Sequence, residues 1–315
     1  MLKLSRRIRR LRGVGWRNIM AKINMDLIKK LRDKTQVGMM DCKKALIEAD
    51  GDFEKAVEIL RKKGAKVAAK RAGNITENGT IASYISDDNK LGVLVEVGCE
   101  TDFAANTEDM RNFALTVAKI LAETECGCGV DLERECVLNQ KLESRDMTIH
   151  DLFEELTAKI SEKIDISRCA KFYTDNGLIN AYVHAGNTVG AMVELMVSNL
   201  NDNNIDAIKS LVKDICMHVA VMKPLCVEPV QLSQEDIEKE KAAQREQLKE
   251  SGKPENIIDK IVEGKIGKYY EEVCLLNQKF IKNDKISVSK HIEEISKKAS
   301  CTVSVVRYAM FSIGK

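Results

Sequence analysis

The sequence predicts an α+β fold in which small antiparallel sheets are covered by helices and a helical module precedes them. Two observations lead to this prediction. A pattern of two β-branched segments followed by a helix occurs twice along the chain, and apolar residues at helical spacing fill the region before the first copy. A length of 315 residues allows two or three domains, at roughly 100–200 residues each.

The composition is typical of a folded, water-soluble protein. Hydrophobic residues make up 44% of the chain and charged residues 31%, and no run approaches the roughly 18 apolar residues that span a membrane. Several of the 10 cysteines, among them Cys42, Cys99 and Cys216, fall inside apolar patterns, where a thiol acts as a small hydrophobe. We therefore expect free thiols in a reducing cytoplasm and no contact with a membrane.

The first 19 residues differ in charge from the rest. They hold seven Lys and Arg and no acid, and the whole chain carries +2, so residues 20–315 carry −5. A mildly acidic body argues against direct nucleic-acid binding, because contact with phosphates needs clustered Lys and Arg.

The basic extension (1–19) has two interpretations. It is either a targeting peptide, since it is Arg-rich and lacks acids, or a stretch upstream of a true start at Met20, which we favour. A twin-arginine signal is disfavoured because no apolar segment follows Arg7. The expected location is cytoplasmic, and organellar only if residues 1–19 are a transit peptide.

Residues 20–72 are predicted to form a module of three short helices and a linker. Because helices this short are unstable alone, the three must pack on one another. Asp52 is the expected N-cap of the third helix, Gly64 its expected end, and residues 66–71 a basic linker. The apolar positions that define the helices are, in order, Leu27, Ile28 and Leu31, then Met39, Cys42, Ala45, Leu46 and Ala49, then Phe53, Ala56, Val57 and Leu60.

The remaining residues contain the repeat. Each copy is predicted to hold a β-hairpin followed by a helix, at 79–85, 91–97 and 109–122 in the first copy and at 177–183, 189–195 and 205–221 in the second. The repeat predicts two related core subdomains, 73–165 and 166–315. Residues 284–311 are predicted to add a helix and a strand that close the second sheet.

Residues 233–274 are predicted to form an antiparallel helical hairpin inserted in the second subdomain. Ser233-x-x-Asp236 is typical of a capping box, and the Gly-Lys-Pro run after Ser251 predicts one helix end and the next start. The apolar seam of the second helix consists of Ile257, Ile258, Ile261, Val262 and Ile266. A solvated stabilising arm and an arm that contacts a partner are equally consistent with this pattern.

No catalytic motif is recognisable in the chain. The phosphate-binding, dinucleotide-binding, zinc-protease and serine-hydrolase motifs are all missing from the sequence. His218 lies within an apolar helix and is predicted to be a satisfied core histidine. Cys126, Cys128 and Cys136 have a spacing that fits no zinc pattern, with no histidine near, so a metal there is disfavoured. We expect neither an enzyme nor a cofactor.

Several motifs together resemble one family. Residues 35–46 with 50–52, and residues 99–105 (Cys-Glu-Thr-Asp-Phe-Ala-Ala), are similar to the elongation factor Ts family. Segments at 159–160, 182–184, 217–220 and 251–254 match the same family in the right order, so the resemblance covers roughly residues 20–315. It implies a guanine-nucleotide exchange factor whose partner is the GTPase elongation factor Tu.

The resemblance also implies roles for individual residues. Met39, Met40 and Asp41 are expected to contact the partner's nucleotide-binding domain, and Ile160 and His184 other surfaces of it. The segment Thr101, Asp102, Phe103 and Ala104 is expected to enter that domain near its magnesium site, with Phe103 as the wedge. Local chemistry alone favours a different interpretation, a helix start capped by Thr101 or Asp102 with Phe103 in the core.

The sequence departs from the family at a few positions. Ala104 follows Phe103 where valine is usual, Gly98 precedes Cys99 where asparagine is common, and Ala185 separates His184 from Gly186. The alternative function is a binding module, because the three-helix unit is UBA-like and resembles ubiquitin-associated domains. Such a module would tether a partner without changing its nucleotide off-rate.

Overall fold

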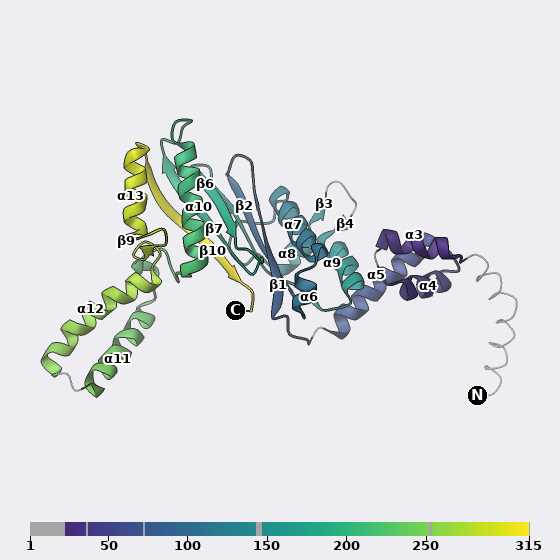
Figure 1. Ribbon diagram of the computed structural model, residues 1–315, viewed down its shortest axis with the longest axis horizontal. Coiled ribbons are helices and arrows are strands. Elements are labelled where there is room, and N and C mark those ends of the chain that lie inside the picture. The colour runs from purple at the N-terminus through teal and green to yellow at the C-terminus, as the bar shows by residue number, and fades with distance from the viewer. Residues whose placement is uncertain (1–22, 36, 72, 143–146, 252–253, 315) are drawn as a thin grey trace.

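The computed structural model describes residues 23–314 except 36, 72, 143–146 and 252–253 (Figure 1). Helices and small antiparallel sheets alternate along the chain, which confirms the α+β class. The predicted extension 1–19 and the predicted start Met20 lie outside the described residues. No helix in the described ranges has both the length and the apolar character needed to cross a membrane.

The N-terminal module consists of α3 (Met25–Thr35), α4 (Met39–Glu48) and α5 (Phe53–Lys70). Their predicted apolar positions, except the exposed Met39, form one cluster that includes Leu31, Cys42, Leu46 and Leu60. The Asp52 carboxylate accepts a hydrogen bond from the Lys55 amide at 3.1 Å, as expected of an N-cap. The three predicted helices are therefore present and packed together, whereas their likeness to ubiquitin-associated domains stays a prediction.

The predicted end of the third helix at Gly64 is wrong. α5 continues through Gly64 to Lys70, so the expected basic linker at 66–71 is almost entirely helical. A Cβ at Gly64 would lie 2.3 Å from the carbonyl oxygen of Glu154 in α9 (Ile149–Ile160). Gly64 therefore permits close packing of two helices and does not end one.

Two three-stranded antiparallel sheets form the centre of the protein. The first has the order β1-β2-β5, with bounds Asn78–Ile85, Leu91–Cys99 and Ile164–Tyr173. The second has the order β10-β7-β6, with bounds Thr302–Ser312, Val189–Ser198 and Gly177–Val183. Both predicted hairpins are present. The predicted boundary between residues 165 and 166 falls inside β5, which pairs with β2 and so belongs to the first sheet.

The sheets face each other, and helices cover their outer sides (Figure 1). On β2, Val93, Val95 and Val97 point toward α7 (Glu108–Glu123), whereas Leu94 packs against the second sheet. α10 (Ile205–Met222) and α13 (Val288–Lys298) cover the second sheet. The alternation of strand side chains accounts for a strand that is buried on both faces.

Shorter elements complete the two subdomains. The first contains α6 (Asp102–Ala105), α8 (Arg134–Leu138) and the strands β3 (Lys141–Leu142) and β4 (Met147–Thr148). The second contains η1 (Pro229–Gln231), β8 (Lys279–Phe280) and β9 (Asn283–Ser287). The domain limits 20–72, 73–165 and 166–315 stay a prediction.

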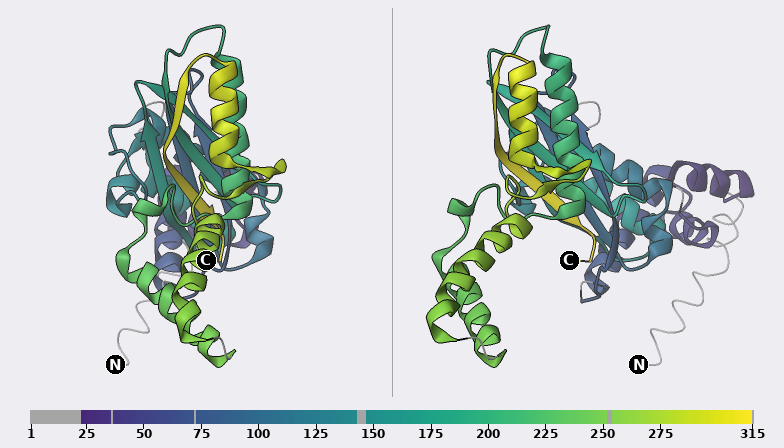
Figure 2. Two further views of the ribbon diagram at one scale, coloured as in Figure 1. Left: turned by 90° about the vertical axis from the view of Figure 1, so that its left-hand side faces the viewer. Right: turned by 60° about the vertical axis from the view of Figure 1, so that its left-hand side comes forward.

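The helical hairpin is formed by α11 (Gln234–Glu250) and α12 (Glu255–Val273) and projects away from the sheets (Figure 2). Leu248, Ile258, Val262 and Ile266 form its small core. Ser233 caps α11, because its hydroxyl accepts a hydrogen bond from the Asp236 amide at 3.0 Å.

Candidate functional site

The candidate site is the turn that connects β2 to α7 and contains the short helix α6. Thr101 caps α6, since its hydroxyl oxygen accepts from the Ala104 amide at 3.2 Å. The same hydroxyl donates to the Glu162 carboxylate at 2.9 Å, and the Thr101 amide donates to it at 3.2 Å. Ala104 and Ala105 are buried against the sheet. The turn is therefore anchored at its cap and along its inner face.

Glu100 fixes the start of this turn. Its carboxylate accepts hydrogen bonds from the Arg71 guanidinium at 2.8 Å, the Asn74 side chain at 2.9 Å and the Lys163 backbone amide at 2.5 Å. The Lys163 amide, and then the Arg71 guanidinium, hold the pKa of Glu100 below its usual value. One carboxylate thus ties the segment after α5 and the segment between α9 and β5 to the start of the candidate site.

Phe103 points away from the protein, with 83% of its surface exposed. The interpretation of Phe103 as a core residue is therefore wrong, while the expected cap at Thr101 or Asp102 is confirmed, with Thr101 as the cap. Burying a phenylalanine side chain is worth about 1.5–3 kcal/mol. A phenylalanine exposed on an anchored turn is available for burial by another protein, in the way that aromatic anchors of protein interfaces are buried.

Cys99 lies beneath the turn and is fully buried. Burial, with a contribution from the Glu162 carboxylate, raises the pKa of the Cys99 thiol to about 11. Its Sγ donates to the Thr101 carbonyl at 3.2 Å. This protonated thiol is a structural donor below the turn and offers no nucleophile at neutral pH.

The methionine pair lies on a different element, at the start of α4. Met40 is 65% exposed and Met39 is 36% exposed, although Met39 was grouped with the apolar stripe of its helix. Asp41 is partly exposed, and its carboxylate forms an ion pair with Lys63 at 2.7 Å. The structure therefore leaves Met40 open to a partner and holds Asp41 against α5.

Ile160 and His184 lie far apart in the sequence and on different subdomains. Ile160 is the last residue of α9 and packs at the edge of the first core. His184 is exposed at the turn between β6 and β7, where its Nδ1 lies 2.9 Å from the Tyr182 hydroxyl. Asn187 of the same turn accepts a hydrogen bond from the Ile81 amide of β1 at 2.7 Å. The His184 turn is thus attached to the first sheet.

A groove of about 260 Å³ lies between this turn, β1 and α7. Its lining includes Val183 from the end of β6, Asn187 from the turn, and Arg111 and Leu115 from α7. Arg111 also donates to the carbonyl of Asn106, just after α6, at 2.8 Å. Arg111 and Leu115 were not predicted. Leu115 is partly exposed on a helix whose other apolar residues are mostly buried, and this break in the pattern is the signal that could have identified it.

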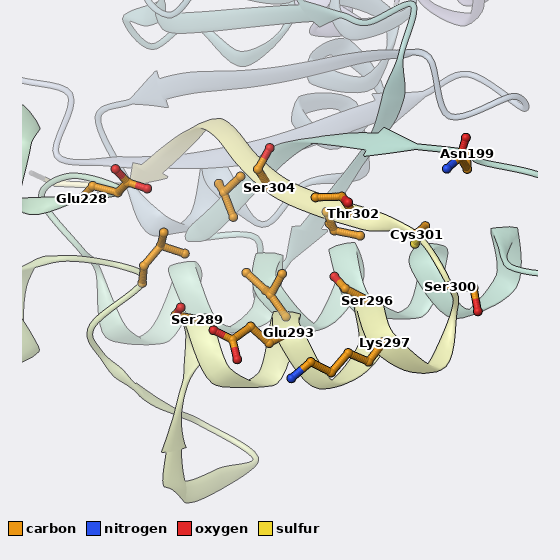
Figure 3. Close-up of a pocket in the computed structure, with 14 residues that line it drawn as sticks. Asn199, Glu228, Ser289, Glu293, Ser296, Lys297, Ser300, Cys301, Thr302 and Ser304 are labelled. Atoms are coloured by element: carbon orange, nitrogen blue, oxygen red, sulfur yellow. The ribbon is translucent and has the colours of Figure 1, made fainter.

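Two other features do not provide a reactive centre. In the described ranges, the group of potential metal ligands is His150, Asp151 and Glu154, and Arg61 forms ion pairs with both of its carboxylates. A groove of about 500 Å³ lies between α13 and β10 (Figure 3). It belongs to the second sheet, whereas α6 packs on the first.

An anchored turn that displays an aromatic side chain, on a fold of two related subdomains, is consistent with a protein that binds another macromolecule. Comparison with known proteins gives the family. A model described as "Elongation factor TS" matches residues 100–315, and the chain belongs to the elongation factor Ts family.

Full-length relatives agree with this assignment. The elongation factor Ts of Clostridium botulinum (strain Eklund 17B / Type B) is 41% identical over 293 residues, which cover 93% of each chain. That of Prosthecochloris aestuarii (strain DSM 271 / SK 413) is 41% identical over 297 residues, which cover 94% of this chain and 100% of the relative. The candidate turn lies at the start of the range that the family model matches.

Proposed function

We propose that this chain is a guanine-nucleotide exchange factor: it binds elongation factor Tu in its GDP form and promotes the release of GDP and its exchange for GTP. The observation that supports this most is the 83% exposure of Phe103 on a capped turn of an elongation factor Ts family member. An exchange factor performs no covalent step. It needs only a rigid surface that competes with the nucleotide site of its partner.

Phe103 is the wedge in this mechanism. A magnesium ion bridges the phosphates of a bound nucleotide and offsets their charge. An aromatic side chain that enters beside the ion and shifts the groups holding it weakens nucleotide binding. Asp102 accompanies Phe103, while Thr101 and Ala104 hold the turn in place by capping and by burial. The anchoring matters because a turn that moved on contact would not displace the groups of the partner that hold the magnesium ion.

The energy required is modest. A thousandfold acceleration of release needs only about 4 kcal/mol of differential stabilisation. Linkage requires that a factor which weakens GDP binding itself binds the nucleotide-free partner more tightly by the same factor. A few buried anchors supply energies of this size. Phe103 and Met40 are suitable anchors, because both are large, apolar and exposed in the free protein.

The remaining contacts hold the partner at other surfaces. Met39 and Met40 at the start of α4 are proposed to lie against the nucleotide-binding domain of elongation factor Tu, together with Asp41. Ile160 and His184 are proposed to contact further surfaces. The exposure of His184 and the partial exposure of Ile160 support these assignments.

The direct test is the release of fluorescent GDP from purified elongation factor Tu. The full chain at micromolar concentration is expected to accelerate release well above the spontaneous rate. Binding without any change in the GDP off-rate would identify a tether and contradict the exchange mechanism. No binding at all would contradict the choice of partner.

The variant Phe103→Ala tests the wedge. We expect exchange to slow by about 30-fold, from a loss of ~2 kcal/mol at a buried anchor, with a smaller effect on binding of the GDP form. Val230→Ala is a matched control, because Val230 is 84% exposed on η1 in the other subdomain, and it should leave exchange unchanged. Equal effects of the two substitutions on exchange would contradict the role of Phe103.

A further inference from the structure

Two sulfur atoms in the first subdomain approach each other unusually closely. Cys126 Sγ and Cys136 Sγ are 2.7 Å apart, whereas another neighbouring pair, Cys226 and Cys274, is separated by 3.5 Å. A disulfide bond is about 2.05 Å long. The first pair therefore needs a movement of only roughly 0.7 Å to reach bonding distance.

The chain between these cysteines is held in place by the sheet. Gly129 exchanges two backbone hydrogen bonds with Lys171 of β5, at 2.8 and 2.9 Å, and the Leu132 amide donates to the Cys169 carbonyl at 2.8 Å. The segment thus extends the edge of the first sheet. Cys126 enters it after α7, and Cys136 lies in α8. The short sulfur distance is a consequence of fixed backbone on both sides.

The two thiols differ in access. Cys126 is only 4% exposed, whereas Cys136 is partly exposed. The Gln140 side-chain amide lies 3.6 Å from Cys136 Sγ and donates to the Cys136 carbonyl at 2.8 Å, which fixes the turn of α8 that carries this thiol. A reagent from solvent therefore reaches Cys136 first.

A metal ion does not account for this geometry. Among the residues that the structure describes, no third cysteine, histidine or carboxylate completes a group around the two sulfurs within 4.8 Å. Structural zinc needs four such ligands. The pair is thus arranged for bonding between two sulfurs.

We propose that Cys126 and Cys136 are a redox-active dithiol that closes to a reversible intrachain disulfide, with a low-molecular-weight disulfide as the oxidant. The Cys136 thiolate attacks the small disulfide, forms a mixed disulfide and releases one small thiol. Cys126, losing its proton to solvent, then attacks Cys136 Sγ and expels the second small thiol. Two protein thiols and one small disulfide thereby become one protein disulfide and two small thiols.

The position of Cys126 suits it to the second step. Burial and the neighbouring Cys136 raise the pKa of Cys126 to about 12, so it is a poor nucleophile toward reagents in solvent. Proximity compensates in the second step, because the target sulfur is already in contact. The closed loop would tie the end of α7 to α8 and constrain the unfolded chain.

The test is oxidation of the full chain with oxidised glutathione, followed by alkylation of remaining thiols and mass spectrometry. We expect a bond between Cys126 and Cys136, reversal by dithiothreitol and a rise in Tm of about 5 °C on oxidation. Cys126→Ser and Cys136→Ser should abolish the bond, whereas Cys128→Ser should keep it. The Cys128 variant is needed because trypsin leaves Cys126 and Cys128 on one peptide, so the mass of the linked peptides does not distinguish these two cysteines. A chain that stays reduced, a stable mixed disulfide at Cys136 or a bond from Cys128 would overturn the proposal.

Discussion

His218 shows how one buried residue is held by its hydrogen-bond geometry. It is fully buried in α10, and its Nδ1 accepts from the Ile281 backbone amide at 3.2 Å. A backbone amide can only donate, so Nδ1 carries no proton and Nε2 donates to the Gln278 side chain at 2.9 Å. Gln278 in turn donates to the Glu272 carbonyl at 2.7 Å. The predicted core histidine is confirmed, and its neutral form is the one that fits.

This geometry predicts a dependence of stability on pH. Burial lowers the pKa of His218, and the pKa of His291, which stacks on Phe280, is lowered for the same reason. The unfolded chain, with a His pKa of about 6.5, therefore binds protons before the folded chain does. The free energy of unfolding should be highest above that pH and fall below it by up to about 1.4 kcal/mol per pH unit for each group.

Urea unfolding at several pH values checks this. His218→Gln should be less stable at pH above 7 but should lose less on acidification than the wild type. His184→Gln is the matched control, because it makes the same substitution at an exposed histidine. The role of His218 is contradicted if its variant loses stability with acid as steeply as the wild type.

Phe103 and its neighbours show how much of the site could be predicted from the sequence, residue by residue. Local chemistry correctly predicted a helix cap at Thr101 or Asp102, because capping depends on neighbours in the sequence, and Thr101 is the cap. It wrongly placed Phe103 in the core, because whether a side chain faces inward depends on how α6 sits on the sheet. The resemblance to elongation factor Ts was needed to expect a partner there. Neither local chemistry nor the family resemblance predicted that the Glu100 carboxylate accepts hydrogen bonds from both Arg71 and Lys163.

At the level of elements, Gly64 is the clearest discrepancy between pattern and structure. Glycine after an apolar stripe usually ends a helix, yet here the following residues are good helix formers and α5 continues. The reason is tertiary, since a Cβ at Gly64 would lie 2.3 Å from the Glu154 carbonyl oxygen and 3.0 Å from Ala158 Cβ. The close contact joins the N-terminal module to α9.

Gly64→Ala is therefore expected to destabilise the protein by about 1–2 kcal/mol. The intrinsic helix gain of alanine over glycine, about 1 kcal/mol, is outweighed by overpacking against backbone. Gly267→Ala in α12 is the control, because nothing lies within 4 Å of the Cβ position there, and it should be neutral or stabilising. Thermal unfolding followed by circular dichroism measures both. A Gly64→Ala protein at least as stable as the wild type would contradict the close packing.

The same tertiary dependence explains which elements could be predicted. The two hairpins and their helices followed from the repeat, because their alternation is local. β5 was not predicted, since Arg168 and Lys171 interrupt its apolar pattern. Lys171 is nevertheless buried, because its ammonium donates to the Leu121 and Thr124 carbonyls at the end of α7, at 2.7 and 2.5 Å. No sequence pattern reveals that compensation.

For the whole molecule, the two subdomains are joined by reciprocal contacts. The Ile81 amide of the first sheet donates to the Asn187 carbonyl of the second, and the Ile179 amide donates to the Asn89 carbonyl, both at 2.7 Å. Asn89 and Asn187 both adopt a left-handed conformation, with φ of 57° and 56°. The repeat recognised in the sequence is thus also an approximate twofold arrangement in space. Each hairpin turn accepts a hydrogen bond from a strand of the other sheet.

Two arginines in the core between the sheets occupy corresponding positions in this twofold arrangement. Arg168 pairs with the buried Glu96 at 2.5 Å and lies over the Phe311 ring, 4.8 Å from its centre. Arg307 pairs with the buried Glu194 at 2.6 Å and lies over the Phe172 ring at 4.3 Å. Each arginine therefore neutralises a carboxylate of its own sheet and contacts an aromatic ring of the other.

Removing either arginine should leave a buried carboxylate without its partner, at a cost of about 3–5 kcal/mol. We expect Arg168→Met and Arg307→Met to lose similar free energies of unfolding in urea, because their surroundings correspond. Adding Glu96→Met to Arg168→Met should restore most of the loss, since no charge then remains to be compensated. Arg245→Met is the control, because Arg245 pairs with the exposed Asp259, and it should change stability by no more than about 0.5 kcal/mol. If the double variant is no more stable than Arg168→Met alone, the loss comes from packing on Phe311, and the unpaired carboxylate is not its cause.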